Sequence, residues 1–323
     1  MNRFEFVRAT SIPDALDLVS EKPASVLKTG GIDLLDHLKE HLSEPPRIVD
    51  LKAIPGLNAI AEEADGSLRI GPLVTLAQIA AHPAVLATHA ALAQACGEAA
   101  SPQIRNVATL GGNLLQRPRC WYYRLESYRC LKKGGDICFA VGGQNRYHTI
   151  LGDGPCNAPH PSNAAVALVA LGASLTLASR QGARTVPAEQ FFTLPSPDPE
   201  RENTREAGEI LSQIKLPAAP GVRSTYASVC ERAAFDWPLV SAAVALRTEG
   251  GLVREARIVL GAVATRPWRS SAAERLLVGR RLDDATGEAV AQAAVAGAQP
   301  LSENGYKIAQ AKVLLRRTLA AIA

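Results

Sequence analysis

The spacing of hydrophobic and polar positions divides the chain into three parts. In residues 1–57, apolar positions follow a helical period twice and form a short strand-like run after each. Ser11 can cap the first helix with its hydroxyl, and Gly30-Gly31 separates the first strand from the second helix. We predict helices over 13–19 and 32–41 and strands over 25–28 and 47–50. This first part is therefore predicted to be a small α/β unit.

The second part, residues 58–217, mixes regular and irregular stretches. We predict strands over 68–71, 174–177 and 211–216 and helices over 76–81, 89–99 and 164–171. Residues 101–115 are expected to form a loop, and residues 194–206 an exposed connection. Residues 116–160 have no clear period and are rich in Arg, Tyr, Gly and Cys. A loop of this length inside a domain needs another organising feature.

The third part, residues 218–323, begins after a turn at Pro220-Gly221. Its pattern predicts three strands followed by three helices. The strands are expected over 223–229, 239–248 and 253–263, and the helices over 271–277, 285–296 and 304–321. This order predicts an antiparallel sheet with helices on one face, so the fold class of the whole chain is α+β.

Composition limits the classes of function. The chain has 323 residues, 35 Lys and Arg against 31 Asp and Glu, and a net charge of +4, which is too small to indicate nucleic-acid binding. No apolar stretch approaches the ~20 residues of a membrane span, and Met1 to Phe6 do not resemble an export signal. We therefore expect a cytoplasmic protein, or one carried across a membrane by a partner that bears the signal.

Four of the six cysteines, Cys120, Cys130, Cys138 and Cys156, lie in the irregular stretch with the spacing C-x9-C-x7-C-x17-C. Four thiolates are the number that a [4Fe–4S] cluster needs. Zinc sites usually contain short CxxC-type pairs, so zinc is the weaker interpretation, and clustering within 37 residues argues against four unrelated cysteines. Cys96 and Cys230 lie in periodic runs and are expected to pack as small apolar residues.

Two glycine-paired segments are suited to hold a nucleotide. The first is the LKTGGIDLL segment at 27–35, where bare backbone N–H groups and a helix N-terminus can surround a phosphate. The second is SPQIRNVATLGGNL at 101–114, where Thr109 and Asn113 can hydrogen-bond phosphate or ribityl oxygens. Neither is a GxGxxG motif, so an NAD site of the Rossmann type is not predicted. We also find no nucleophile elbow and no Walker loop, and we predict no catalytic residue.

These segments, with the pair Ile210-Leu211, resemble the FAD-binding medium subunits of the molybdenum hydroxylases, over essentially the whole chain. The cysteine-containing insertion after the second segment is most similar to the FAD and [4Fe–4S] subunits of periplasmic-type bacterial aldehyde oxidoreductases. The 4-hydroxybenzoyl-CoA reductase beta subunit is also similar. The resemblance implies a PCMH-type FAD-binding fold of two subdomains, 1–57 and 58–217, and a C-terminal domain, 218–323, of the CO dehydrogenase flavoprotein type.

The resemblance also implies roles for individual residues. Cys120, Cys130, Cys138 and Cys156 would ligate the cluster. The first glycine segment would wrap the FAD pyrophosphate through Leu27, Lys28, Thr29, Gly30, Gly31, Ile32, Asp33, Leu34 and Leu35. The remaining FAD contacts would come from Ala100, Ala108, Thr109, Gly112, Asn113, Asn163, Ile210 and Leu211. Asn163 stands where the family often has Asp, and Ser228 where many relatives have Lys, which bears on flavin potential more than on binding.

The implied function is electron transfer within a heterotrimer that oxidises aldehydes. A large partner would carry the molybdenum cofactor, a small partner would carry [2Fe–2S] clusters, and electrons would leave through FAD to an external acceptor. Three alternatives remain: a subunit of a 4-hydroxybenzoyl-CoA reductase-like complex, a zinc-binding scaffold without flavin, and a cell-wall flavoenzyme with FAD and no cluster.

Overall fold

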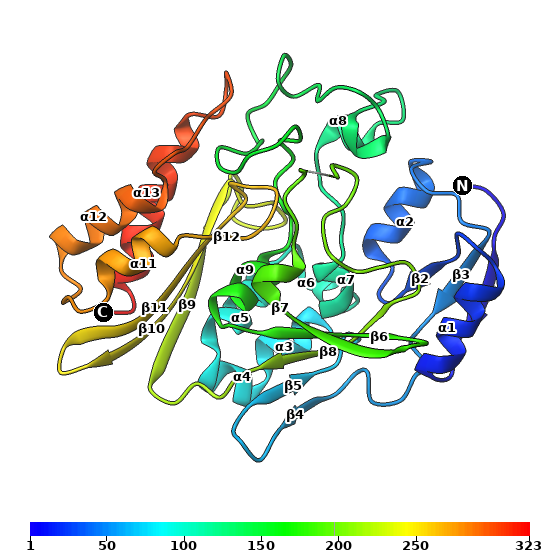
Figure 1. Cartoon of the computed structure of the whole chain (residues 1–323), viewed down its shortest axis with the longest axis horizontal. Helices are drawn as coiled ribbons and strands as arrows, with labels where there is room; N and C mark the ends of the chain where they lie inside the picture. The colour runs from blue at the N-terminus through cyan, green and yellow to red at the C-terminus, as the bar shows by residue number, and fades with distance from the viewer. Residues whose placement is uncertain (197) are drawn as a thin grey trace.

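A computed structural model describes residues 1–196 and 198–323 and contains three β-sheets with their helices (Figure 1). The predicted α+β class is confirmed. Helices and strands alternate in the first sheet, and in the third the strands precede the helices. Among the described residues, no helix combines the length and the apolar character required to cross a membrane.

The first sheet is parallel, with strand order β1-β3-β2, and its strands are β1 (Glu5–Arg8), β2 (Val26–Lys28) and β3 (Arg47–Asp50). Two helices connect these strands, α1 (Ile12–Glu21) and α2 (Ile32–Lys39). Ser11 caps α1 as predicted, because its Oγ accepts a hydrogen bond from the Asp14 N–H at 3.2 Å. Strand β1 was not predicted, since it has only four residues and its two apolar residues, Phe6 and Val7, do not alternate with polar ones.

The second sheet is antiparallel, with strand order β4-β5-β8-β6-β7. Its strands are β4 (Ile60–Glu62), β5 (Leu68–Ile70), β6 (Ser174–Ser179), β7 (Gly182–Pro187) and β8 (Ile210–Leu216). Its helices are α3 (Leu76–Ala81), α4 (Pro83–Thr88), α5 (Ala90–Glu98), α9 (Asn163–Ala170) and α10 (Ala188–Phe191). Every residue of α9 is buried, and the hydrophobic core around it extends from this sheet to Ala243 and Val259 of the third sheet.

Residues 101–115 are not a loop as predicted but form two short helices, α6 (Pro102–Arg105) and α7 (Leu110–Leu114). Each helix is capped by the residue before it. The hydroxyl of Ser101 accepts from the Ile104 N–H, and that of Thr109 accepts from the Gly112 N–H. Helices of four and five residues are too short to produce a periodic pattern, so only the caps could have indicated them.

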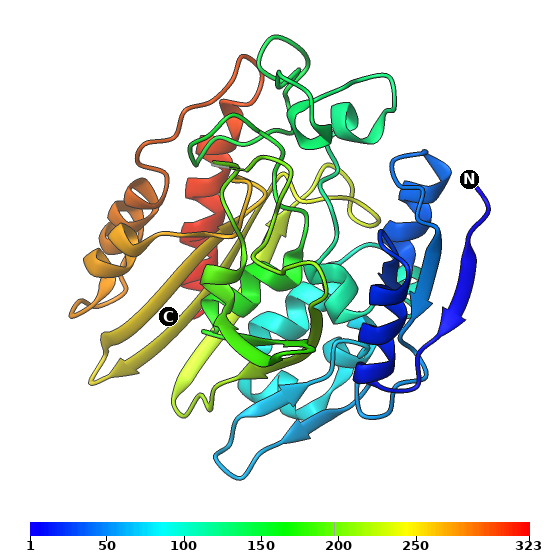
Figure 2. The same ribbon diagram turned by 45° about the vertical axis from the view of Figure 1, so that its right-hand side comes forward.

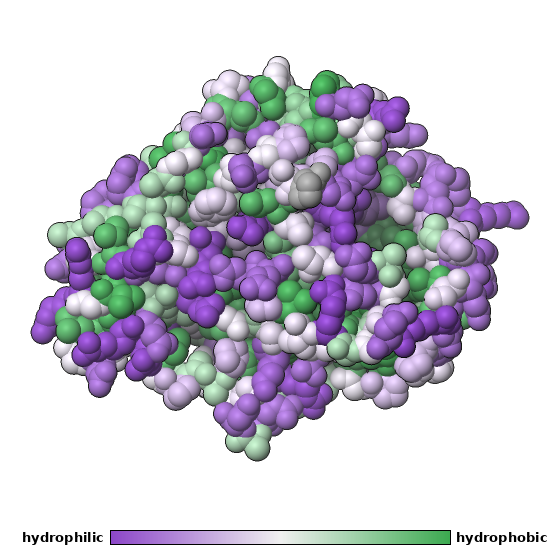
Figure 3. All heavy atoms as spheres, in the orientation of Figure 1, coloured by the Kyte–Doolittle hydropathy of each residue, from purple (hydrophilic) through white to green (hydrophobic). Residues whose placement is uncertain are grey.

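Residues 116–160, here called the cysteine segment, are irregular as predicted. They contain only the short helix α8 (Trp121–Arg124) and the 3-10 turn η1 (Leu131–Lys133). The segment forms the upper part of the molecule in Figures 1 and 2. Figure 3 shows hydrophobic residues at this upper edge. Leu125, Ile137 and Val141 of the segment are about half exposed.

The third sheet is antiparallel, with strand order β12-β11-β10-β9. Its strands are β9 (Val222–Val229), β10 (Val240–Glu249), β11 (Leu252–Gly261) and β12 (Trp268–Arg269), and its helices are α11 (Ser271–Leu277), α12 (Asp284–Ala294) and α13 (Tyr306–Ala320). Three strands and three helices lie within two residues of their predicted limits. The two-residue β12 was not predicted. The helices lie to one side of the sheet in Figure 2 and share a hydrophobic core with it.

Candidate functional site

The two glycine segments lie against each other. Thr109 Oγ1 donates a hydrogen bond to Thr29 Oγ1 at 2.7 Å, across two segments that are 80 positions apart. A Cβ at Gly30 would lie 2.3 Å from the Val107 carbonyl oxygen, and one at Gly112 would lie 2.9 Å from Thr29 Oγ1. Only glycine permits this close approach of two backbones. The structure thus brings together Thr29, Gly30, Thr109 and Gly112 from the predicted FAD residues.

A helix begins in each glycine segment, but the two helices are capped differently. Gly31, with φ of 84°, is the N-cap of α2 and provides no side chain for the first-turn N–H groups. At α7, by contrast, the Thr109 hydroxyl already accepts from Gly112. The uncapped N–H groups and the positive end of the α2 dipole are therefore the better place for a phosphate.

Other predicted FAD residues have contacts within the protein. Lys28 Nζ lies 3.2 Å from Asp50 Oδ1, and Asp33 points toward the cysteine segment instead of the glycine pair. Ile32 and Leu35 are partly exposed. The Ala100 carbonyl accepts from Arg105. The residues that contribute to hydrophobic cores are Leu27, Ala108, Ile210 and Leu211.

A large open cavity with a volume of about 380 Å³ lies beyond the second glycine segment. The cysteine segment, the start of α9 and the connection between β9 and β10 contribute its walls. Its lining includes Cys120, Trp121, His148, His160, Asn163 and Trp237. The Ser162 hydroxyl donates to Asn113 Oδ1 at 2.6 Å, which links this cavity to the second glycine segment. Asn113 and Asn163 are therefore connected through Ser162.

Two buried histidines in this wall have an unpaired ring nitrogen. Among the described residues, neither His148 Nδ1 nor His160 Nε2 has a hydrogen-bond partner. Burial lowers the pKa of His148 to about 4 and that of His160 to about 3, so both rings are neutral at physiological pH. Unpaired buried polar atoms are uncommon in native proteins and call for a partner. A bound ligand with a polar ring system in this cavity would supply such a hydrogen-bond partner.

The four cysteines of the cysteine segment line one smaller cavity, here called the cysteine cavity, with a volume of about 20 Å³. All six cysteines of the chain are free. Within residues 1–196 and 198–323, no group of three or more His, Cys, Asp or Glu side chains is placed to hold a single metal ion. The thiols surround a space and do not converge on one point. Cys120 also lines the large cavity, so the two cavities share a wall.

Several N–H groups point at these sulfur atoms. His148 Nε2 lies 3.2 Å from Cys120 Sγ, and Asn157 Nδ2 lies 3.6 Å from Cys138 Sγ. Backbone N–H groups of Tyr122 and Tyr123 also reach Cys120. Burial raises the pKa of the free Cys120 thiol to about 12. Donors around a buried sulfur are suited to a thiolate that is held by metal, since they stabilise its negative charge.

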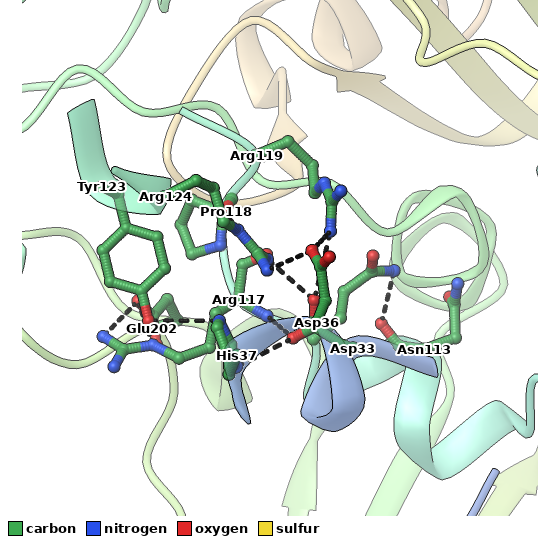
Figure 4. Close-up of polar contacts among 11 residues, drawn as sticks. Asp33, Asp36, His37, Asn113, Arg117, Pro118, Arg119, Tyr123, Arg124 and Glu202 are labelled. Atoms are coloured by element: carbon green, nitrogen blue, oxygen red, sulfur yellow. Dashed lines mark hydrogen bonds and ion pairs between the residues drawn. The ribbon is translucent and has the colours of Figure 1, made fainter. Parts of the chain in front are cut away.

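Figure 4 shows how the start of the cysteine segment is fixed to α2. Arg124 donates to Asp33 Oδ1 at 2.7 Å and to Asp36 Oδ2 at 3.0 Å, and Arg119 reaches the same two carboxylates. The Arg117 N–H also donates to Asp33. Arg117 also pairs with Glu202 at 3.0 Å, and none of the three arginines lines the cysteine cavity.

The spacing of His37 and His41 on a predicted helix favours exposure of both side chains, but this prediction is wrong for His37. Its ring is buried beside Tyr123, whose hydroxyl lies 3.3 Å from His37 Nε2. His41, four residues further on, is exposed as expected. The burial of His37 depends on a partner 86 positions away in the sequence, so no local pattern could have indicated it.

The other end of the cysteine segment is fixed by residues that sequence reasoning did not identify. Lys307 is completely buried, and its Nζ donates to the carbonyl oxygens of Tyr147, His148 and Ala262. Asn304 Nδ2 donates to the carbonyl oxygens of His148 and Thr149. A lysine within a helical pattern normally indicates a solvent-facing position, so the sequence carried no signal for this role.

Comparison with known proteins gives a consistent result over the chain. Residues 2–219 match the family described as the FAD binding domain in molybdopterin dehydrogenase, and residues 225–322 match the CO dehydrogenase flavoprotein C-terminal domain. The chain is 34% identical to the aldehyde oxidoreductase FAD-binding subunit PaoB of Escherichia coli, covering 100% of this chain and 98% of that protein.

Two further similarities concern carbon monoxide dehydrogenases. The medium chain from Hydrogenophaga pseudoflava is 28% identical over 98% of this chain and 96% of its own length. The solved structure of reconstituted CO dehydrogenase from Oligotropha carboxidovorans superposes with a TM-score of 0.79 and 26% identity, covering 100% of this chain and 99% of that one.

Proposed function

Because the chain belongs to the FAD-binding medium subunits of the molybdenum hydroxylase family, we propose that it is the FAD and [4Fe–4S] electron-transfer subunit of a heteromeric aldehyde oxidoreductase. Its partners are a large subunit with the molybdenum cofactor and a small subunit with [2Fe–2S] clusters. An external acceptor takes the electrons. The observation that carries the proposal is the cysteine cavity, which shares Cys120 with the large cavity.

The described residues offer a separate site for each part of FAD: the pyrophosphate, the ribityl chain and the isoalloxazine. The N–H groups at the start of α2 and the backbone of the glycine pair hold the pyrophosphate. Thr109, Gly112 and Asn113 bind the phosphates and the ribityl chain from the other side. The large cavity near Asn163, which His148 lines with its unpaired Nδ1, would take the isoalloxazine. Ile210 and Leu211 support this site from the core.

For the cluster, the fit rests on four free thiols around one space and on the donors behind them. Cys120, Cys130, Cys138 and Cys156 are the ligands, and His148 and Asn157 donate toward two of their sulfurs. Tyr122 and Phe139 line the same cavity and exclude water from it. When bound, FAD exchanges electrons singly or in pairs and the cluster exchanges them singly, while this chain supplies position, burial and hydrogen bonds.

Metal and flavin analysis of the complex purified without air tests the proposal. Beyond the iron and sulfide of the small subunit's [2Fe–2S] clusters, we expect about four further iron and four further sulfide per chain, as a cubane requires, together with one FAD. Cys138→Ser should lose most of this further iron and retain the flavin. Cys230→Ser is the matched control, because Cys230 does not line the cysteine cavity, and it should retain both cofactors.

The same material separates the alternatives. Zinc without flavin would contradict the proposal and indicate a scaffold, whereas flavin without iron would indicate a flavoenzyme that lacks a cluster. Reduction of the complex by an aldehyde supports the oxidoreductase. Reduction only by a low-potential donor would instead indicate a complex similar to 4-hydroxybenzoyl-CoA reductase.

A further inference from the structure

His148 stands in the wall between the two cavities. It is 2% exposed and lines the large cavity together with Cys120, which also belongs to the cysteine cavity. Its Nε2 lies 3.2 Å from Cys120 Sγ, and its ring packs edge-on against Trp121 with centroids 5.3 Å apart. Of the six histidines, only this one has a described hydrogen bond to a cysteine sulfur.

The chemistry of the pair determines where the proton lies. A thiolate that ligates metal has no hydrogen and can only accept, so the proton of the His148–Cys120 hydrogen bond must be on Nε2. In a neutral imidazole the other nitrogen is then a bare acceptor. That nitrogen, Nδ1, is the one without a partner among the described residues. The His148 ring therefore donates from Nε2 to the Cys120 sulfur.

Three hydrogen bonds fix the backbone of His148. Its carbonyl oxygen accepts from Asn304 Nδ2 and Lys307 Nζ, both at 3.1 Å, and its N–H donates to the Asn145 carbonyl at 2.9 Å. Lys307 belongs to α13, and Asn304 lies just before this helix. The C-terminal part of the chain thus fixes a residue of the cysteine segment at the boundary of both cavities.

On the basis of the proposed function, we propose that His148 is a positioning residue that raises the reduction potential of the [4Fe–4S] cluster by donating from Nε2 to the sulfur of Cys120. A hydrogen bond to a cluster sulfur stabilises the more negative, reduced state. Asn157, on the far side at Cys138, makes a longer contact and lies away from the large cavity. Its contribution to the potential is therefore smaller.

The test is a potentiometric titration of the purified complex, with the cluster followed by its electron paramagnetic resonance. His148→Phe keeps a planar ring but removes the donor. At the wild-type midpoint potential, the ratio of oxidised to reduced cluster should rise about tenfold, equivalent to ~59 mV for one electron. His148→Gln restores an N–H donor and should recover part of the shift.

His160→Phe is the matched control. His160 is a second buried histidine in the wall of the large cavity, but its Nδ1 accepts from the Ser162 N–H and its ring contacts Phe192. This change should leave the ratio of oxidised to reduced cluster within about twofold of the wild-type value, because no hydrogen bond to a cluster sulfur is lost. An equal shift in both histidine variants would overturn the proposal.

A second measurement does not depend on variants that fold. Wild-type complex grown with ¹⁵N-histidine should show magnetic coupling between the reduced cluster and one histidine nitrogen. Absence of this coupling, or an unchanged potential in iron-containing His148→Phe, would refute the role of His148 while the cluster itself stands. A wild-type complex with no iron beyond that of its [2Fe–2S] clusters would instead refute the proposed function and this inference with it.

Discussion

The C-terminal sheet with its helices and the cysteine segment are held in place by different forces. Strands β9–β12 and helices α11–α13 share a continuous core, in which Val244, Ile258 and Leu315 are completely buried. The cysteine segment has seven residues in α8 and η1 combined and little other regular structure. It depends on side chains from distant elements at both of its ends.

The contrast lies in what each region needs before it becomes stable. Burial of apolar surface is the main contribution in the C-terminal part, whose strands and helices form a core that Ile150 and Leu151 of the cysteine segment join at its edge. The cysteine segment instead combines ion pairs to α2, hydrogen bonds from Lys307 and Asn304, and four thiols around an internal space. We therefore expect loss of the cofactor to affect the segment and leave the C-terminal part intact.

Removal of iron is the largest perturbation of this comparison. Chelation of the complex under reducing conditions should raise proteolytic cleavage within residues 116–160 by about tenfold or more, because cleavage follows the population of the open form. Mass spectrometry of timed digests locates the cut sites. The tight turn at Gly250-Gly251, between β10 and β11, serves as the internal control. Equal acceleration at both sites would mean that the cofactor stabilises the whole chain.

Truncation of a core side chain is the reverse perturbation. Leu315→Ala in α13 should cost about 2–5 kcal/mol of local stability, since a fully buried leucine leaves a cavity. Hydrogen exchange of the β10 and β11 amides measures this loss. Iron content should stay at the wild-type value. Iron loss in proportion to the loss of exchange protection would show that the two regions are not independent.

The link between α2 and the cysteine segment is an intermediate case. Arg124→Gln removes the donors to Asp33 and Asp36 and should cost about 1–3 kcal/mol, because these carboxylates are only partly exposed and lose a charged partner. Hydrogen exchange of α2 and α8 reports the change. Arg124→Lys is the matched control: it keeps the charge but cannot reach both carboxylates with one fork, so it should recover only part of the loss.

The same contrast explains which parts of the fold the sequence predicted. The apolar runs in residues 223–263 pair with their neighbours in sequence and are separated by turn residues, so three strands were located within two residues. Strands β1 and β7 are mostly exposed and do not alternate apolar with polar residues. Central strand β8 was recognised as a strand, but its position between β5 and β6 depends on partners far away in sequence.

The candidate site shows the same division. The number and spacing of the four cysteines predicted that they belong together, and the structure places them around one cavity. The His148–Cys120 contact has no sequence signature, because it depends on Lys307 and Asn304 from the other end of the chain. The burial of His37 against Tyr123 was missed for the same reason.

An exposed ion pair within the C-terminal sheet gives the smallest expected effect. Arg247 of β10 and Glu255 of β11 face each other in register, and both side chains are largely in solvent. Arg247→Gln should change the exchange protection of these strands by no more than about 0.5 kcal/mol, because solvent and salt screen such pairs. Arg124→Gln removes the same kind of group from a partly buried network. If the loss of exchange protection in Arg247→Gln were as large as that in Arg124→Gln, burial would not distinguish the two ion pairs. Polar contacts would then not hold the cysteine segment more strongly than they hold the C-terminal sheet.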